Sequence, residues 1–364
     1  MKGLYIAPVD CKSKIYIGVC KKINYQINAF KSLGIDMDYV NISGKNINFL
    51  NENLIFNTKH FKQPIFFKKI IKNLNKFEKQ YDFVYIRFSF ANPYIFSLSK
   101  KLKKKRIKVF IEIPTYPYTE ELEKSVKNSI YKCIDKFLWK YASKNIYRLV
   151  LTNDKEQLFG IKAVNIFNGI DSNEIDINKS MHKKKEKEIN LIGVANISKW
   201  HGYDRVISGL YEYYKKERNI EVHFYIVGDG KEKNFLNNLC NKLKMNRYVH
   251  IVGTKYGEDL DVLYNRMNIG VSSLALFRAG GGHDPIKSKE YIAKGIPVII
   301  GYEDRALPNN LEFVYKVPEN NLPINIEEIV TKYRISDINA NKIVQYAIDN
   351  LTWKSQIRKV IAEI

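Results

Sequence analysis

The sequence lacks any long apolar run and any cysteine spacing typical of a metal site. A membrane-spanning helix needs about 18 or more consecutive apolar residues, and no run of that kind occurs. The N-terminal apolar run, residues 3–9, ends at Asp10 and is too short for a signal peptide. The four cysteines are scattered without a CxxC motif: Cys11, Cys20, Cys133 and Cys240. We therefore expect a cytoplasmic protein with no membrane span, no zinc site and no disulfide framework.

Acidic residues are also few. The 364 residues contain 38 Asp and Glu against 60 Lys and Arg, a formal net charge of +22. Such a balance attracts nucleic acid, anionic lipid or phosphorylated substrates, and its sign alone does not choose among them. The basic runs lack the aromatic platform or fold motif of a nucleic-acid binder, so we expect no nucleic-acid partner. Part of the lysine excess can be compositional bias.

The chain alternates short β-rich runs with helical stretches, the rhythm of α/β domains with parallel sheets. Strands are expected at 4–7, 37–41, 83–88, 108–113 and 149–152, and again at 190–194, 222–228, 250–253, 269–274 and 298–300. The length favours two Rossmann-like domains, 1–172 and 173–344. The last helix, about 345–364, can pack on either domain, and we assign it provisionally to the first.

Residues 278–300, RAGGGHDPIKSKEYIAKGIPVII, contain the strongest candidate binding motif. Three glycines at 280–282 let the backbone come close to a ligand. Asp284 and Pro285 favour a helix start, which leaves the amides of residues 286–288 without intrahelical partners. Such amides bind anions, phosphates in particular.

Glu290 lies about 9 Å beyond this helix start at 1.5 Å per residue. That distance matches the reach from a diphosphate to the hydroxyls of its ribose. Gly295 is expected to end the helix, and residues 296–300 behind it form a buried parallel strand. An ordinary capped helix with a glycine turn is the alternative interpretation.

Four segments carry a family resemblance: GVANISKWHGYDRVI, FYIVGDGKEKNFL, VHIVGTKYGEDLDVLYNRMNIGVSS and PIKSKEYIAKGIPVI. In this order they resemble the donor domain of family 4 retaining glycosyltransferases. The resemblance implies the GT-B fold, in which two Rossmann-like domains face each other across a cleft. In the first half, IRFSFANPYIF and IEIPTYPYTEEL look like a bacterial subgroup that builds capsular and other surface polysaccharides.

The resemblance implies specific donor contacts. Gly18 would lie in a glycine loop facing the donor diphosphate, and Glu290 would be the second carboxylate of a Glu-x7-Glu motif, holding the ribose. Gly282 stands where the first Glu is expected, with His283 or Asp284 as substitutes. The full expected donor set is Gly18, Asn196, Lys199, His201, Gly228, Gly253, Arg278, Gly282, His283, Asp284, Pro285, Ile286, Lys287, Ser288 and Glu290.

A second departure concerns the cationic pair that follows the first donor-domain strand. Asn196 and His201 occupy the positions where the family has Arg and Lys. A phosphate clamp can still be assembled from Lys199, His201, Arg278 and Lys287, because a diphosphate needs donors within reach and no unique residue type. We predict Lys199 and His201 as catalytic residues of this clamp.

Three residues of the first half are candidates for the acceptor side: Arg87, Glu112 and Tyr116. Arg87 and Glu112 end predicted strands, where α/β sheets place function, and Glu112 is also a catalytic candidate. A helix cap or a salt bridge is the alternative for Glu112. The DLD sequence at 259–261 resembles a metal-binding Asp-x-Asp, but a helix start explains it equally, and we predict no metal.

Apolar and cationic residues alternate at helical spacing in IFFKKIIKNLNKF, residues 65–77. The pattern predicts a helix on an anionic membrane, with Lys68, Lys69, Lys72 and Lys76 attracting lipid and Ile65, Phe66, Phe67, Ile70 and Ile71 inserting. The run 100–108 adds further charge. A solvated helix face in a lysine-rich protein is the alternative.

The predicted function is a metal-independent retaining glycosyltransferase, a hexosyltransferase. It moves a sugar from a UDP- or GDP-linked donor to a lipid-linked or growing glycan, with no other cofactor, peripherally at the inner face of the plasma membrane. Two alternatives remain: a sugar-nucleotide epimerase of the same fold, and a catalytically degenerate binding subunit of a polysaccharide assembly complex.

Overall fold

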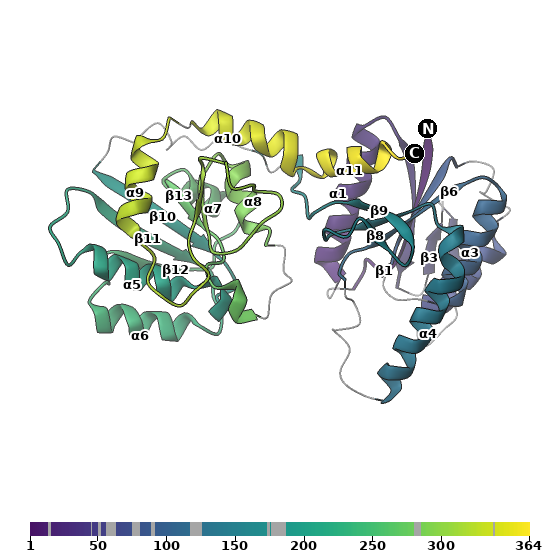
Figure 1. The fold of residues 1–364 in the computed structure, drawn as a ribbon, viewed down its shortest axis with the longest axis horizontal. Coiled ribbons are helices and arrows are strands. Elements are labelled where there is room, and N and C mark those ends of the chain that lie inside the picture. Colours follow the sequence, from purple (N-terminus) through teal and green to yellow (C-terminus); the bar gives the residue numbers. More distant parts are fainter. Residues whose placement is uncertain are drawn as a thin grey trace. The chain divides into compact units, whose positions relative to one another are not determined.

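The structure is a computed structural model that describes residues 1–13, 16–44, 46–49, 52–55, 63–74, 81–88, 92–116, 126–172, 175, 187–279, 285–337 and 339–364. The chain forms two compact units (Figure 1). Unit 1 contains Met1–Asn168 and Trp353–Ile364, and unit 2 contains Gly169–Thr352. The C-terminal helix α11 (Trp353–Ile361) therefore belongs to the same unit as the N-terminus.

Unit 1 is built on a nine-stranded sheet of order β4-β3-β2-β1-β5-β6-β7-β9-β8. Its strands are β1 (Lys2–Asp10), β2 (Asp36–Ser43), β3 (Asn46–Phe49), β4 (Glu52–Ile55), β5 (Phe83–Arg87), β6 (Lys108–Ile113), β7 (Arg148–Leu151), β8 (Gln157–Leu158) and β9 (Ile161–Asn165). The central strands are parallel, whereas β3, β4 and β8 pair in antiparallel fashion at the edges.

Two apolar cores flank this sheet. Helix α1 (Ile17–Ser32) packs Ile23, Ile27 and Phe30 on one side, together with α11, as their spacing predicts. Helices α2 (Gln63–Lys72), α3 (Pro93–Lys104) and α4 (Val126–Ala142) contribute to the other core. A short turn, η3 (Ser143–Asn145), follows α4.

The predicted membrane insertion through α2 is wrong. Phe66, Phe67 and Ile70 are fully buried in the core of unit 1, and Ile65 and Ile71 pack against that core. An amphipathic helix has the same sequence pattern whether its apolar face meets a protein core or a membrane. Lys68 and Lys72 are exposed, and Lys76 lies outside the described residues.

Unit 2 contains an all-parallel six-stranded sheet of order β12-β11-β10-β13-β14-β15. The strands are β10 (Glu188–Val194), β11 (Glu221–Val227), β12 (Val249–Gly253), β13 (Ile269–Val271), β14 (Val298–Ile300) and β15 (Val314–Lys316). The connecting helices are η6 (Lys199–His201), α5 (Tyr203–Tyr213), α6 (Lys233–Leu243), α7 (Gly257–Tyr264), η7 (Leu276–Ala279), α8 (Lys287–Ala293), α9 (Ile326–Ile335), α10 (Ala340–Tyr346) and η8 (Ala347–Leu351).

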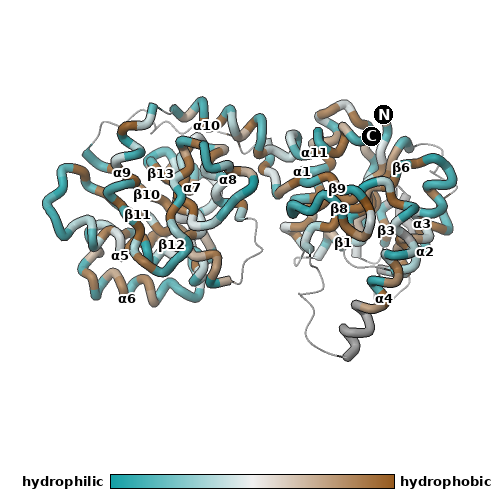
Figure 2. Tube along the Cα trace, viewed as in Figure 1, coloured by the Kyte–Doolittle hydropathy of each residue, from teal (hydrophilic) through white to brown (hydrophobic). Residues whose placement is uncertain are grey.

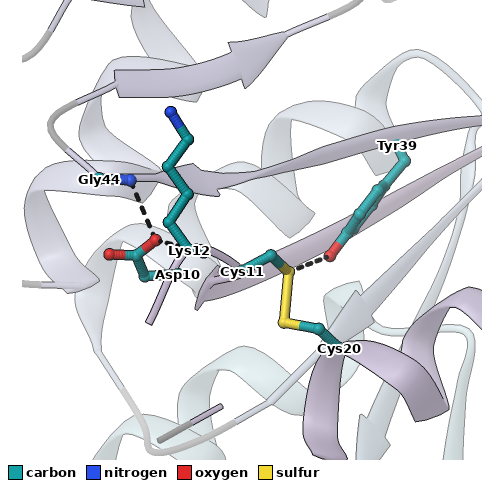
Figure 3. Close-up of a disulfide and its surroundings, with 6 residues drawn as sticks. All are labelled: Asp10, Cys11, Lys12, Cys20, Tyr39 and Gly44. Carbon is teal, nitrogen blue, oxygen red and sulfur yellow. Dashed lines mark hydrogen bonds between the residues drawn. A yellow bond between two sulfur atoms is a disulfide. The ribbon is translucent and has the colours of Figure 1, made fainter. Parts of the chain in front are cut away.

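A disulfide joins Cys11 to Cys20, with 5.8 Å between their Cα atoms (Figure 3). The expectation of no disulfide is therefore wrong. Cys11 follows β1 and Cys20 lies in the first turns of α1, so the short connection between these elements brings the two cysteines together across a sequence separation of 9. The Sγ of Cys11 also lies 3.6 Å from the Tyr39 hydroxyl. Cys133 and Cys240 are free thiols.

Among the described residues, no helix combines the length and the apolar character needed to cross a bilayer.

Candidate functional site

The candidate donor site of unit 2 begins at the carboxyl ends of β10 and β11. The backbone N–H of Ile197 donates to the Asp229 carbonyl at 2.6 Å, so the two connections lie side by side. Gly228 has a φ of +131°, and a Cβ there would lie 1.8 Å from the Ala195 carbonyl oxygen. The close approach of these two backbone segments is enough to require glycine at 228, whether or not a ligand binds there. Gly253 has a φ of +73° and open space around it.

The η6 turn, which carries Lys199 and His201, is docked on the segment that follows β13. The N–H groups of Leu274 and Ala275 donate to the carbonyls of His201 and Trp200, at 3.0 and 3.1 Å. Gly202 has a φ of +66°, and a Cβ at that position would touch Leu274 and Ala275. Because β10 and β13 are neighbours in the sheet, the segments that follow these two strands lie side by side although they are far apart in sequence. Asn196 and Lys199, in the segment after β10, are exposed.

The imidazole of His201 is held by the backbone of Ser198. Its Nδ1 lies 3.1 Å from the Ser198 amide nitrogen and 3.2 Å from the Ser198 carbonyl oxygen. Burial lowers the pKa of His201 below its ordinary value, the bond with the Ser198 backbone opposes this shift, and the positive charge of Lys287 lowers the pKa further. Both η6 and α8 lie at the carboxyl end of β10, because η6 follows this strand and the Tyr291 hydroxyl of α8 accepts from the Val194 N–H at 2.9 Å.

Arg278 holds this edge together. Its guanidinium forms a two-point bond with Asp204, NH1 to Oδ1 at 2.8 Å and NH2 to Oδ2 at 3.0 Å. It also donates to the Lys199 carbonyl at 3.0 Å and to Asn321 Oδ1 at 2.9 Å. These bonds engage most of the five donors of the group. The structure therefore gives Arg278 the role of joining η6, η7 and α5, in contrast to the expected direct phosphate contact.

Helix α8 begins at Lys287, with Ile286 as its N-cap. The expected start at Asp284 and Pro285 is therefore two residues too early. Pro285 and Ile286 precede the helix, and Gly282, His283 and Asp284 lie outside the described residues. Lys287 Nζ lies 2.6 Å from Glu290 Oε2, and both side chains are about one-third exposed. Gly295 follows the helix end, as expected. The position requires glycine because its φ is +72° and a Cβ there would lie 2.9 Å from the Cβ of Ala340.

A chain of buried polar groups fixes α8 on the sheet. The Tyr302 hydroxyl lies 3.2 Å from Ser272 Oγ and donates to Ser288 Oγ at 3.1 Å, which in turn donates to Asp304 Oδ2 at 3.3 Å. The Tyr291 hydroxyl accepts from the Val194 N–H at 2.9 Å. The sequence interpretation missed the side chains at 272, 291, 302 and 304. Polar residues directly after β13 and β14 were the available signal.

In unit 1, Arg87 and Glu112 form a buried ion pair. They are register partners on β5 and β6, and Arg87 NH1 lies 2.7 Å from Glu112 Oε1. The Tyr5 hydroxyl lies 3.2 Å from Glu112 Oε2, and Gln26 donates to Oε1 at 3.3 Å. Glu112 has no exposed surface. The structure therefore shows it as a salt-bridge partner, in contrast to the expected contact with a reacting sugar.

Burial alone would raise the pKa of the Glu112 carboxyl. The charges of Arg87 and Lys22, with hydrogen bonds from Gln26 and Tyr5, outweigh it and leave that pKa below its ordinary value. Glu112 is thus an ionised carboxylate inside unit 1.

The other expected residues have ordinary surroundings. Gly18 lies within the first turn of α1 rather than in a loop, is exposed, and has open space where a Cβ would stand. Tyr116 is half-buried and packs edge-on against Phe159. Asp259 lies in the first turn of α7, and Asp261 pairs with Lys294 at 2.8 Å. Within the described residues, no group of three or more His, Cys, Asp or Glu side chains is arranged to hold a metal ion.

Comparison with known proteins was made on sequence and on structure. Residues 174–309 match the family described as "Glycosyl transferases group 1". A search of curated proteins gives no sequence match. Three solved structures are similar over nearly the whole chain.

A glycosyltransferase from Rickettsia africae ESF-5 has a TM-score of 0.62 at 16% identity, covering 99% of this chain and 97% of that one. Anabaena Alr3699/HepE in complex with UDP has a TM-score of 0.61 at 13% identity, covering 100% of both chains. The lipopolysaccharide outer core galactosyltransferase WaaB, in its apo form, has a TM-score of 0.57 at 12% identity, again covering 100% of both.

The family match covers the part of unit 2 that carries Lys199, His201, Lys287 and Glu290, and the structural matches cover both units. The chain thus has the fold of GT-B glycosyltransferases, and the family match within unit 2 supports sugar transfer.

Proposed function

We propose that this protein is a retaining glycosyltransferase that takes a hexose from a nucleoside diphosphate sugar, held by unit 2. One observation carries the proposal: η6 and α8 both lie at the carboxyl end of β10, where η6 follows the strand and the Tyr291 hydroxyl of α8 accepts from the Val194 N–H at 2.9 Å. Lys199 lies on the same turn as His201, and Glu290 lies one turn beyond Lys287. The lysines would thus meet the diphosphate, and Glu290, one turn further along, would meet the ribose.

In the proposed mechanism, the glycosidic bond breaks as negative charge develops on the departing diphosphate. Lys199 and Lys287 supply positive charge, and the imidazole of His201 is proposed to supply a further hydrogen-bond donor. Groups fixed in place before the reaction stabilise such charge without reorganising, and the hydrogen bonds of Ser198 and Arg278 provide that fixation. We propose that no metal is required, because these side chains supply the neutralising charge.

Retention at the anomeric carbon is proposed to use the leaving phosphate as the base for the acceptor hydroxyl. A protein carboxylate is then not needed at the reacting carbon. The burial of Glu112 is compatible with this assignment, and we give the Arg87–Glu112 pair a positioning role at the carboxyl ends of β5 and β6. The acceptor is proposed to be a lipid-linked or growing glycan of a bacterial surface polysaccharide, met at the cytoplasmic face of the membrane.

Donor use is the test of this function. Purified protein is incubated with a panel of UDP- and GDP-linked hexoses, with and without membrane extracts as acceptor source, and nucleoside diphosphate release is measured. We expect release from one donor, at least tenfold faster with acceptor. UDP-glucose is tried early, because HepE has been solved with UDP-glucose.

The Glu290→Gln variant is the negative control, and Glu258→Gln, an exposed glutamate on α7, is the matched one. Interconversion of sugar nucleotides without acceptor would show an epimerase instead. No turnover of any donor, with binding retained, would show a binding subunit.

A further inference from the structure

Helix α4 has two apolar faces, of which only one meets the core of unit 1. Trp139 is fully buried and stacks on Phe159, with 4.4 Å between ring centroids. Leu138 packs against the same core. These contacts fix the orientation of the helix at its C-terminal half, so the opposite face is directed away from the unit. Figure 1 shows α4 extending outward from the sheet.

The outward face is also apolar. Ile134, Phe137 and Tyr141 are 47%, 61% and 57% exposed. Their spacing of three and four places them on one side of the helix, and Phe137 is about 200° of rotation from Trp139. The rings of Phe137 and Tyr141 contact each other, with 4.6 Å between centroids. We call these three residues the α4 stripe. Hydrophobic and hydrophilic residues alternate along the helix (Figure 2).

Positive charge surrounds the α4 stripe. Lys136 and Lys140 are exposed on α4 next to it, and Lys144 follows in η3. The C-terminal end of α3 contacts η3, where Lys103 Nζ donates to the Lys144 carbonyl, and it brings Lys100, Lys101 and Lys104. Within residues 126–145 the sequence has a single acidic residue, Asp135, and within 93–106 it has none. The surface around the stripe is therefore strongly cationic.

We propose that the α4 stripe docks on the anionic surface of a lipid bilayer. Exposed aromatic and aliphatic side chains beside lysines are the pattern of a helix lying in the bilayer interface, and tyrosine is enriched at that depth. An anionic bilayer complements this combination of apolar and cationic side chains without specific contacts. The sequence analysis expected membrane contact through α2, whose apolar residues are buried. The α4 stripe takes its place, because its apolar residues are exposed.

This inference names the membrane contact of the proposed function, but its test needs neither donor nor acceptor. Vesicles of phosphatidylcholine, with or without phosphatidylglycerol, are sedimented with the full-length protein. Wild type is expected to bind the anionic vesicles at least tenfold more tightly than the neutral ones. Binding should weaken strongly between 0.1 and 1 M salt, roughly where the Debye length shrinks from about 10 to about 3 Å.

Two variants with matched controls locate the surface. The triple variant Ile134→Asn, Phe137→Ser, Tyr141→Ser is expected to lose at least tenfold in binding, and Lys136→Glu with Lys140→Glu at least twentyfold, since each cation near an anionic surface strengthens binding about fivefold. The controls remove exposed residues of unit 2: Phe235→Ser with Tyr256→Ser, and Lys231→Glu with Lys242→Glu. They should bind as wild type does. All substituted side chains are exposed, so thermal unfolding should be unchanged.

Cys133 provides a probe beside the α4 stripe. It is exposed, whereas Cys240 is buried and burial raises the pKa of its thiol to about 11, so a thiol reagent labels Cys133 selectively. An environment-sensitive fluorophore there should brighten on anionic vesicles. The same fluorophore on Lys231→Cys, in a Cys133→Ser background, should not.

Unchanged binding of the stripe variant, or equal brightening at both positions, would overturn the proposal. So would a wild-type dimer in solution that the stripe variant abolishes, because a second copy would then cover the stripe. Nucleoside diphosphate binding by the stripe variant should equal that of wild type, so loss of lipid binding is distinguishable from failure of the donor site.

Discussion

Lys287 and Glu290 lie one turn apart on α8, with Nζ of the lysine 2.6 Å from Oε2 of the glutamate. Both side chains are accessible, and the lysine also acts on His201. A diphosphate attracts the cation and ribose hydroxyls attract the carboxylate, so a nucleotide can exchange this partly exposed ion pair for two contacts of its own. An ion pair within reach of solvent contributes little to stability, so the exchange costs little.

The charge of Lys287 can be read out on His201. We predict that Lys287→Met raises the pKa of His201, because the nearby positive charge disfavours imidazolium. Burial still holds that pKa below the ordinary value. Titration of the imidazole signals by NMR measures the change. Lys294→Met is the control, since Lys294 is the C-cap of the same helix but pairs with Asp261. An unchanged pKa in the first variant, or an equal rise in the second, contradicts the geometry.

The clamp residues should act more on turnover than on binding. We predict that Lys199→Ala and His201→Asn each lower kcat about tenfold to a thousandfold, with a smaller change in donor affinity, because the diphosphate gains charge as the bond breaks. Steady-state kinetics, with the donor that the panel of UDP- and GDP-linked hexoses selects, measure both. A rise in KM with kcat preserved would mean that these residues bind only the ground state.

The ion pair in unit 1 should be costly to break on one side. Arg87→Met leaves the Glu112 carboxylate buried without its main partner, and we predict a loss of about 3–5 kcal/mol in the free energy of unfolding. The double variant Arg87→Met, Glu112→Gln should recover part of it. Without Arg87, burial raises the pKa of Glu112, so the deficit of the single variant should shrink as pH is lowered from 7 to 5. Urea unfolding measures each; a pH-independent deficit below 1 kcal/mol would contradict the account.

The disulfide makes a prediction about thiols and stability. Under non-reducing conditions, alkylation of the unfolded protein should modify Cys133 and Cys240 only, and reduction should expose Cys11 and Cys20 as well. Cys11→Ser with Cys20→Ala should lower the free energy of unfolding by about 2–3 kcal/mol for a closed loop of this length. Cys133→Ser should leave it unchanged. Four alkylated cysteines before reduction would show that the bond is absent.

The central strands could be predicted from the sequence because they are short apolar runs that parallel pairing buries on both faces. Strands β3, β4, β8, β9 and β15 were not predicted. The first three pair in antiparallel fashion toward a sheet edge, where half of the side chains need not be apolar, as in NINF and ENLI. Strands β9 and β15 pair in parallel, but IKAVN and VYK are short and contain lysine. Strand β13 is shorter than expected because the chain turns after Val271 toward η7.

The sequence indicated which residue types are candidates for the site, but it did not indicate which side chains contact one another. Both Arg87 and Glu112 end strands, and only the register of β5 with β6 reveals that the two side chains form an ion pair. Arginine is a common phosphate ligand, yet the guanidinium of Arg278 forms hydrogen bonds with the carboxylate of Asp204, which lies 74 residues earlier. Such partners come from the strand order of a sheet, which local patterns do not contain. The missed bond between Cys11 and Cys20 has a different cause, because these residues are close in sequence and the turn from β1 into α1 brings them together.

The central claim is that α8 holds a nucleotide through Glu290, and calorimetric titration of UDP and GDP tests it most directly. We predict that wild type binds one of the two, and that Glu290→Ala weakens this binding at least tenfold, because each ribose bond to a charged acceptor contributes about 1.5–3 kcal/mol. Glu258→Ala, on the exposed face of α7, should bind as wild type does. Equal dissociation constants for wild type and Glu290→Ala, or no binding of either nucleotide, would contradict the account.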